Sequence, residues 1–146
     1  MTSAAPVSGS GITVLGTTFQ NPILLAAGTA GFGRELDDTL ELDALGGIVT
    51  KAVSLAPRAG NRSPRVGEFP AGMINSIGLA NPGVDHVVAR DLPWLERRVT
   101  RARVLVNVVG FEVDEYARVI ARLDASPVIT AYELNLSCPN TSAGGI

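Results

Sequence analysis

Cysteine, histidine and aromatic residues are scarce in this sequence of 146 residues: there is one cysteine, one histidine and 5% aromatic residues. A single cysteine excludes a disulfide bond within the chain. The sequence also has neither a CxxC pair nor the Cys/His spacing of a zinc site, so we expect no metal. This cysteine usage suits a reducing compartment. Few aromatic residues and scattered basic residues argue against nucleic-acid binding.

Long apolar runs and blocks of like charge are also missing, and the net charge is −2. No run approaches the ~20 apolar residues of a membrane span. Residues 1–11 lack the basic and apolar regions of a signal peptide, and we expect them to form a flexible arm. With 46% hydrophobic residues, residues 12–146 can build the core of one domain. Because neither a membrane span nor a signal peptide is indicated, we expect a cytoplasmic protein.

Apolar segments of strand length alternate with segments of helical periodicity, which predicts a parallel sheet covered by helices. A small hairpin is expected first, at 12–15 and 17–20. The predicted strands are 23–26, 47–50, 104–109 and 128–136. The predicted helices are 35–45, 84–90, 94–98 after an interruption at Pro93, and 113–123 with Val113, Tyr116, Val119, Ile120 and Leu123 facing inward. The long connection 52–83 is expected to be a functional loop.

Two α/β architectures fit this alternation. A doubly wound fold can close at this length, whereas a (β/α)8 barrel needs ~250 residues, so the chain would hold only the first four or so βα units. The glycine-rich loop 27–33 reads G-x-x-G-x-G, which is not the dinucleotide fingerprint. A fourth strand that is followed only by the loop 143–146 favours part of a barrel.

Polar residues gather where the predicted strands end, which is where ligands bind in α/β folds. Strand alternation places Glu133, Asn135 and Ser137 on one face. Cys138 follows on a loop that Pro139 stiffens, a position that suits a base or a nucleophile. A lone cysteine is more often a small apolar residue, but these polar neighbours favour the chemical role.

Four stretches carry a resemblance to a known family: N-P with A-A-G-T and G-F-G in 21–33, G-G-I-V-T-K-A-V with P-R and G-N-R-S-P-R in 46–65, G-M-I-N-S-I-G-L-A-N-P-G in 72–83, and E-L-N-L-S-C-P-N in 133–140. In this order they resemble the dihydroorotate dehydrogenases, FMN-dependent barrel enzymes of pyrimidine biosynthesis. Cysteine at position 138 is like class 1, and the loops at 31–33 and 81–84 are more like the class 1B catalytic subunit, N-terminal half.

The resemblance implies a reaction at Cys138. It would be the catalytic base that removes the C5 proton of dihydroorotate while C6 gives a hydride to FMN. Lys51 would contact both the flavin and the substrate carboxylate. The alternative is a lysine that extends from the end of a strand into solvent, but its place at the end of a buried strand beside two glycine-rich loops argues against it.

The other site residues also follow from the resemblance. The implied substrate-binding residues are Lys51, Asn75, Ser76, Ile77, Gly78, Leu79, Asn135 and Asn140. The implied FMN-binding residues are Ala27, Gly28, Lys51, Ala52, Asn107 and Asn135. From the residues alone, 75–79 could be an ordinary turn and Asn107 a core asparagine with its hydrogen bonds satisfied. Many relatives have serine where Ala27 stands.

The resemblance further implies a homodimer and, for the class 1B form, a separate subunit with FAD and an iron–sulfur centre that uses NAD. Two alternatives remain. One is a flavin oxidoreductase like dihydropyrimidine dehydrogenase, which shares the N-L-S-C-P element. The other is a truncated half-barrel without activity of its own. The loop 75–79 favours orotate, because its carboxylate needs several hydrogen-bond donors.

Overall fold

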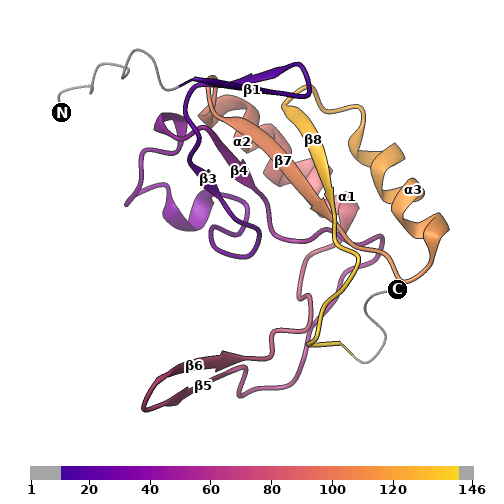
Figure 1. Ribbon diagram of the computed structural model, residues 1–146. Coiled ribbons are helices and arrows are strands. Elements are labelled where there is room, and N and C mark those ends of the chain that lie inside the picture. Colours follow the sequence, from indigo (N-terminus) through magenta and orange to yellow (C-terminus); the bar gives the residue numbers. More distant parts are fainter. Residues whose placement is uncertain (1–10, 142–146) are drawn as a thin grey trace.

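The computed structural model of the protein describes residues 11–141, so the arm expected at the N-terminus lies outside the described residues except for Gly11. Its centre is a parallel sheet of four strands: β3 (Leu24–Leu25), β4 (Gly47–Val49), β7 (Arg103–Val108) and β8 (Ile129–Leu134). The strands lie side by side in the order β3-β4-β7-β8 (Figure 1). This order follows the chain without reversal. It is the arrangement of successive barrel units, whereas a doubly wound sheet reverses its strand order.

Two of the expected helices agree with the structure. Helix α3 spans Val113–Leu123, as predicted. Its first residue, Val113, is 75% exposed, so it does not belong to the inward stripe. The helical region after residue 83 runs through α1 (Val84–His86), the π-helical segment η3 (Val87–Asp91) and α2 (Leu92–Arg98). Pro93 therefore does not interrupt the helix, because the wider π-helical turns end just before it.

The helix predicted at 35–45 is wrong. This segment forms two short 3-10 turns, η1 (Arg34–Leu36) and η2 (Leu42–Ala44). Thr39 Oγ donates to the carbonyl of Leu36 at 3.1 Å, and such local bonds compete with the helical pattern. Glu35 turns its carboxylate back to accept from the backbone N–H of Phe32 at 3.2 Å.

Two hairpins flank the sheet. The first, β1 (Ile12–Val14) with β2 (Thr17–Phe19), was predicted. The second, β5 (Val66–Phe69) with β6 (Gly72–Asn75), lies within the predicted loop 52–83 and was missed. Glycines and a proline break this segment into pieces too short to show strand periodicity. In Figure 1 it projects away from the sheet, beyond the carboxyl ends of the strands.

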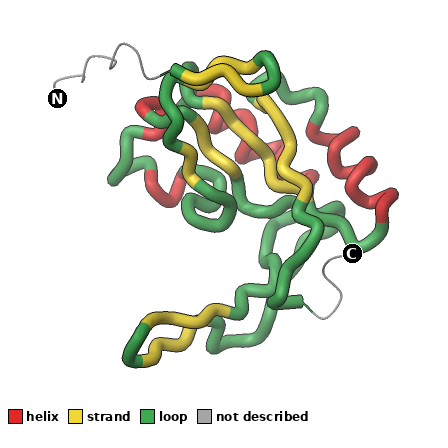
Figure 2. The backbone as a smooth tube through the Cα atoms, viewed as in Figure 1, coloured by secondary structure: helices red, strands yellow, loops and turns green. Residues whose placement is uncertain are grey.

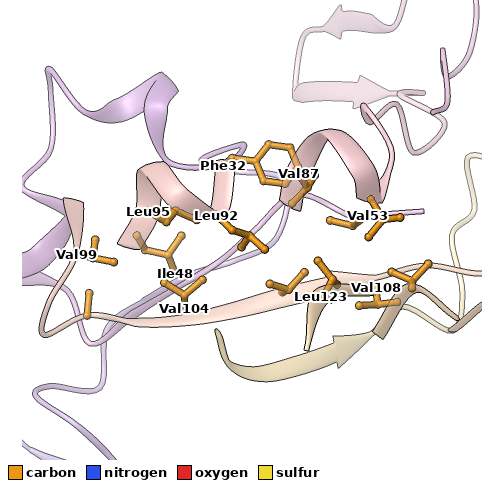
Figure 3. Close-up of a cluster of buried hydrophobic side chains, with 14 of the residues drawn as sticks. Phe32, Ile48, Val53, Val87, Leu92, Leu95, Val99, Val104, Val108 and Leu123 are labelled. Atoms are coloured by element: carbon orange, nitrogen blue, oxygen red, sulfur yellow. The ribbon is translucent and has the colours of Figure 1, made fainter. Parts of the chain in front are cut away.

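The core lies between one face of the sheet and the helices. Ile48, Val104 and Val108 point from the sheet toward Leu95 and Leu123 (Figure 3). Figure 2, in the view of Figure 1, shows α1 and α2 behind the strands and α3 to the side of β8. The opposite face is more open: Leu24, which pairs in register with Gly47, is 44% exposed. Helices thus cover one side of the sheet, as on the outside of a barrel.

None of the helices between residues 11 and 141 is both long enough and apolar enough to cross a membrane.

Candidate active site

A cavity of about 530 Å³ lies where the strands of the parallel sheet end. This volume is within the range of small-molecule sites. Its lining comes from five separate segments: Ala27, Gly28, Thr29, Lys51, Ala52, Asn75, Ile77, Gly78, Leu79, Asn107, Asn135, Cys138 and Asn140. Every site residue expected from the sequence is in this lining except Ser76. Their roles remain predictions, but their convergence is a property of the structure.

Lys51 is held at the end of β4 by backbone hydrogen bonds. Its N–H donates to the carbonyl of Gly31 at 2.7 Å, which ties it to the glycine-rich loop. The preceding Thr50 is fully buried, and its hydroxyl donates to the Lys51 carbonyl at 3.0 Å while accepting from the Asn107 N–H at 3.3 Å. These bonds fix where the backbone of Lys51 leaves the sheet, beside β7.

The Lys51 side chain gives the cavity its charge. Among the described lining residues, it is the only one with a charged side chain, and it forms no ion pair within residues 11–141. A single cation in a cavity otherwise lined by amides, small residues and a thiol suits an anionic ligand.

Asn107 and Asn135 meet at the ends of β7 and β8. Asn107 is 3% exposed and donates from Nδ2 to Glu133 Oε1 at 2.5 Å. Asn135 Nδ2 donates to Asn107 Oδ1 at 3.3 Å, so Glu133 and Asn135 share a face as predicted. Tyr116 of α3 donates to the Asn135 carbonyl at 2.6 Å and anchors the strand end. Asn107 thus has hydrogen-bond partners, as a core asparagine would. It also lines the cavity, as a ligand-binding residue would.

The loops that carry Asn75 and Cys138 are joined by amide hydrogen bonds. Asn140 Nδ2 donates to Asn75 Oδ1 at 3.1 Å. Asn61 Nδ2 donates to Ser76 Oγ at 2.8 Å and to the Asn140 carbonyl at 2.9 Å. The hydroxyl of Ser76 is therefore engaged with Asn61 rather than with the cavity.

Asn61 is a residue that sequence reasoning did not single out, although it stands in the quoted G-N-R-S-P-R stretch. Its backbone N–H also donates to the Ile77 carbonyl at 3.0 Å. Gly78 has a φ of +75°, and a Cβ there would lie 2.5 Å from Asn61 Oδ1. Glycine at position 78 thus permits the close approach of these two segments. Thr29, unlike Asn61, lines the cavity itself, and sequence reasoning did not single it out either.

Cys138 is a half-buried free thiol in the cavity lining. Its carbonyl accepts from both the N–H and the hydroxyl of Thr141 at 3.4 Å, which closes a turn after Pro139. The loop expected at 143–146 lies outside the described residues. The thiol thus stands on a turn, in the same cavity as the ammonium group of Lys51.

Small residues form another part of the lining. A Cβ at Gly28, where φ is +83°, would meet no atom within 4 Å, so open space lies beside the backbone there. Ala27 and Ala52, whose side chains are only methyl groups, also line the cavity. Such a surface leaves room for a flat ring against the backbone. Among residues 11–141, no group of three or more His, Cys, Asp or Glu side chains could hold a metal ion.

Comparison with known proteins gives consistent matches. A family model described as dihydroorotate dehydrogenase matches residues 11–146. The dihydroorotate dehydrogenase B (NAD(+)) catalytic subunit of Desulforudis audaxviator is 51% identical over 135 residues, covering 92% of this chain and 43% of that protein. The subunit of the same name from Geobacter sulfurreducens is 44% identical over 135 residues, covering 92% of this chain and 44% of that protein.

A solved structure gives the same fold. The crystal structure of DHODH from Eimeria tenella in complex with ferulenol matches with a TM-score of 0.73 at 23% identity, covering 91% of this chain and 38% of that one. The chain spans less than half the length of these relatives, and it matches the N-terminal part of the curated ones. The fold is that of a (β/α)8 barrel, of which the chain contains the first four or so βα units.

Proposed function

Because this chain belongs to the dihydroorotate dehydrogenase family, we propose that it forms the part of an active site in which dihydroorotate is oxidised to orotate. The observation that carries the proposal is the shared cavity of Cys138, Lys51 and Asn75, which come from three distant parts of the chain. A thiol, an ammonium group and several amides are the groups that an anionic cyclic amide requires.

The lining also fits the isoalloxazine ring of FMN, which we propose as the cofactor. The methyl groups of Ala27 and Ala52 and the open space at Gly28 would receive the flat ring. Lys51, Asn107 and Asn135 would supply hydrogen bonds to its polar edge. When bound, FMN supplies an acceptor for the hydride that leaves C6 of dihydroorotate.

The residues of this chain would then bind the substrate and take one proton from it. Lys51 pairs with the substrate carboxylate, and Asn75, Asn135 and Asn140 orient the ring through hydrogen bonds, with Ile77, Gly78 and Leu79 alongside. The Cys138 thiolate accepts the C5 proton as the C–H bond breaks. Loss of this proton and of a hydride from C6 leaves the C5=C6 double bond of orotate, so the atoms and electrons balance.

We also propose the partners and the setting of the complete protein. The matched relatives are named as catalytic subunits of an NAD(+) enzyme, which supports a second subunit with FAD and an iron–sulfur centre that passes electrons to NAD. The β5–β6 hairpin exposes the apolar side chains of Val66, Phe69, Met73 and Ile74, which supports a homodimer. The reaction belongs to pyrimidine biosynthesis, in the cytoplasm.

A choice of substrates tests the proposed function. The complete protein with its flavin is mixed anaerobically with dihydroorotate or with dihydrouracil, and flavin absorbance is followed. We expect rapid bleaching by dihydroorotate only. A protein that is bleached by dihydrouracil but not by dihydroorotate would support the enzyme resembling dihydropyrimidine dehydrogenase instead, an alternative that the matches do not favour.

A further inference from the structure

Three polar side chains form a chain that starts outside the cavity and ends in it. The Glu133 carboxylate, on β8, accepts from Asn107 Nδ2 at 2.5 Å. Asn107 Oδ1 in turn accepts from Asn135 Nδ2 at 3.3 Å. Asn107 and Asn135 line the cavity, whereas Glu133 does not. The hydrogen bonds of the Glu133 side chain therefore reach the cavity through the two asparagines.

The direction of this chain follows from the chemistry of its first member. An ionised carboxylate has acceptor oxygens and no hydrogen to donate, so Asn107 must turn its NH2 group toward Glu133. The oxygen of the Asn107 amide then faces Asn135, and Asn135 must direct its own NH2 group back toward Asn107. Asparagine amides are symmetric in shape, so without a fixed end either orientation would satisfy the pair.

The consequence lies in what Asn135 offers to the cavity. One of the two hydrogens on its Nδ2 is engaged with Asn107, and among residues 11–141 no hydrogen bond to its Oδ1 is found. Its backbone N–H and carbonyl are also engaged, with Val108 and Tyr116. The acceptor left for a ligand is Oδ1, which requires a donor on the ligand, and it stands beside the second hydrogen of Nδ2.

We propose that Glu133 is a positioning residue that fixes both amides, so that Asn135 presents an acceptor and the site selects a ligand with a ring N–H at that point. This inference rests on the proposed function, because the ligand is a cyclic amide. Two sources of a ring N–H are compatible with it: the pyrimidine of the substrate and the flavin ring.

The variant that tests the proposal is Glu133→Gln in the complete protein, which keeps the shape of the side chain. A glutamine amide can donate or accept, so the direction of the relay is no longer fixed. Glu96→Gln is the matched control, because Glu96 is an exposed carboxylate on α2 outside the cavity and the charge change is the same. Glu133→Asp keeps an acceptor-only group and is expected to rescue part of the effect.

Three measurements distinguish the two sources of the N–H: flavin midpoint potential, FMN content, and dissociation constants for orotate and its N1-methyl and N3-methyl derivatives. If the substrate provides the donor, wild type discriminates against one methyl derivative and Glu133→Gln weakens orotate binding by about tenfold, the scale of one buried hydrogen bond. Glu133→Gln then no longer discriminates against this methyl derivative, while its flavin midpoint potential equals that of wild type. If the flavin provides the donor, the potential and FMN content change while the dissociation constant for orotate stays.

Either pattern supports the positioning role. A Glu133→Gln protein that matches Glu96→Gln in all three measurements would overturn it. An equal loss of affinity for orotate and both methyl derivatives that Glu133→Asp does not rescue would also overturn it. Failure of the proposed function would show differently: wild type would not be bleached by dihydroorotate, whatever residue stands at position 133.

Discussion

At the scale of single residues, the proposed chemistry depends on a thiol and a cation in one cavity. Cys138 stands on the turn that follows β8, and Lys51 follows β4. They are 87 positions apart in the sequence, and only the parallel sheet brings the two strand ends to the same edge. The two residues are expected to contribute differently: Cys138 would exchange a proton, whereas Lys51 would bind a negatively charged group.

Replacement of Cys138 by alanine removes the proposed base and little else. In the complete protein, we expect Cys138→Ala to lower the rate of flavin reduction by dihydroorotate at least ~100-fold, which is the usual scale for a general base. FMN should remain bound, because the cavity keeps its other groups. Stopped-flow bleaching under anaerobic conditions gives the rate, and flavin absorbance gives the occupancy. Bleaching near the wild-type rate would exclude Cys138 as the base.

Lys51→Ala tests the cation. Lys51 is the only lysine in the sequence and the only charged side chain among the described residues of the lining. Its loss is expected to weaken both FMN and orotate binding, by roughly tenfold or more for a charged hydrogen bond. Titration of the apoprotein with FMN and of the flavoprotein with orotate measures the two affinities. Normal values for both would place Lys51 outside the site.

At the scale of elements, Asn61 joins the two loops of the candidate site that carry Asn75 and Cys138. Its side-chain amide reaches both Ser76 and Asn140, and its backbone holds Ile77. We expect Asn61→Ala to raise KM for dihydroorotate several-fold, since each lost hydrogen bond contributes about 1 kcal/mol. FMN content should not change, because Asn61 does not line the cavity.

Steady-state kinetics at saturating electron acceptor measure this effect, and Arg62→Ala, an exposed neighbour, is the matched control. An unchanged KM, or an equal change in both variants, would show that the bridge does not organise the loops. A loss of FMN in Asn61→Ala alone would mean that the two loops support the cofactor instead.

The elements also show what a sequence can and cannot predict here. Strands β4, β7 and β8 and helix α3 were found because each has a clear apolar pattern. The segment 35–45 was assigned to a helix because leucines recur at helical spacing, but local side-chain bonds of Glu35 and Thr39 favour tight turns. The β5–β6 hairpin was missed because all of its residues are exposed, so no buried face leaves a periodic pattern.

The candidate site was predicted better than the elements around it. Twelve of its thirteen lining residues follow from motif resemblance, and Thr29 does not. Short motifs mark side chains that contact ligands, whereas Asn61 supports loops through contacts that depend on the fold. Its partners Ser76 and Asn140 are 15 and 79 positions away, and no local pattern indicates such pairing.

At the scale of the whole molecule, one half-buried carboxylate connects the turn η2 to the segment between α2 and β7. Asp43, whose side chain is 15% exposed, accepts backbone N–H bonds from Thr100, Arg101 and Ala102 at 2.7–2.9 Å and the Thr100 hydroxyl at 2.8 Å. Burial raises the pKa of this carboxyl, but the hydrogen bonds outweigh it and lower the pKa from 3.8 to about 2.

The pH dependence follows from this direction. Because the folded pKa lies below the unfolded one, ionised Asp43 stabilises the fold above pH ~4, and this contribution disappears as the pH falls toward 2. We expect Asp43→Asn to lower the free energy of unfolding at pH 7 by about 2 kcal/mol. The gap to wild type should shrink between pH 4 and pH 2. Denaturant unfolding measures it, with exposed Asp38→Asn as control; a gap that widens in acid would contradict this assignment.

The sheet itself has two edges. Within residues 11–141, β3 pairs only with β4 and β8 only with β7, so both outer strands have an unpaired side. The face away from the helices also exposes Leu24, and Leu134 on the edge strand is 50% exposed. Unpaired edges and open apolar surface favour association between chains.

We therefore expect the 146 residues expressed alone to bind FMN poorly and to associate. The cavity is lined from one side of the barrel only, so a bound ring would stay open to water and lose most of the burial that stabilises it. Light scattering after size-exclusion chromatography gives the mass, and the absorption spectrum gives the bound flavin, with the complete protein as the reference. A yellow, monodisperse monomer of the 146 residues would contradict both expectations and would mean that these four strands close a working site by themselves.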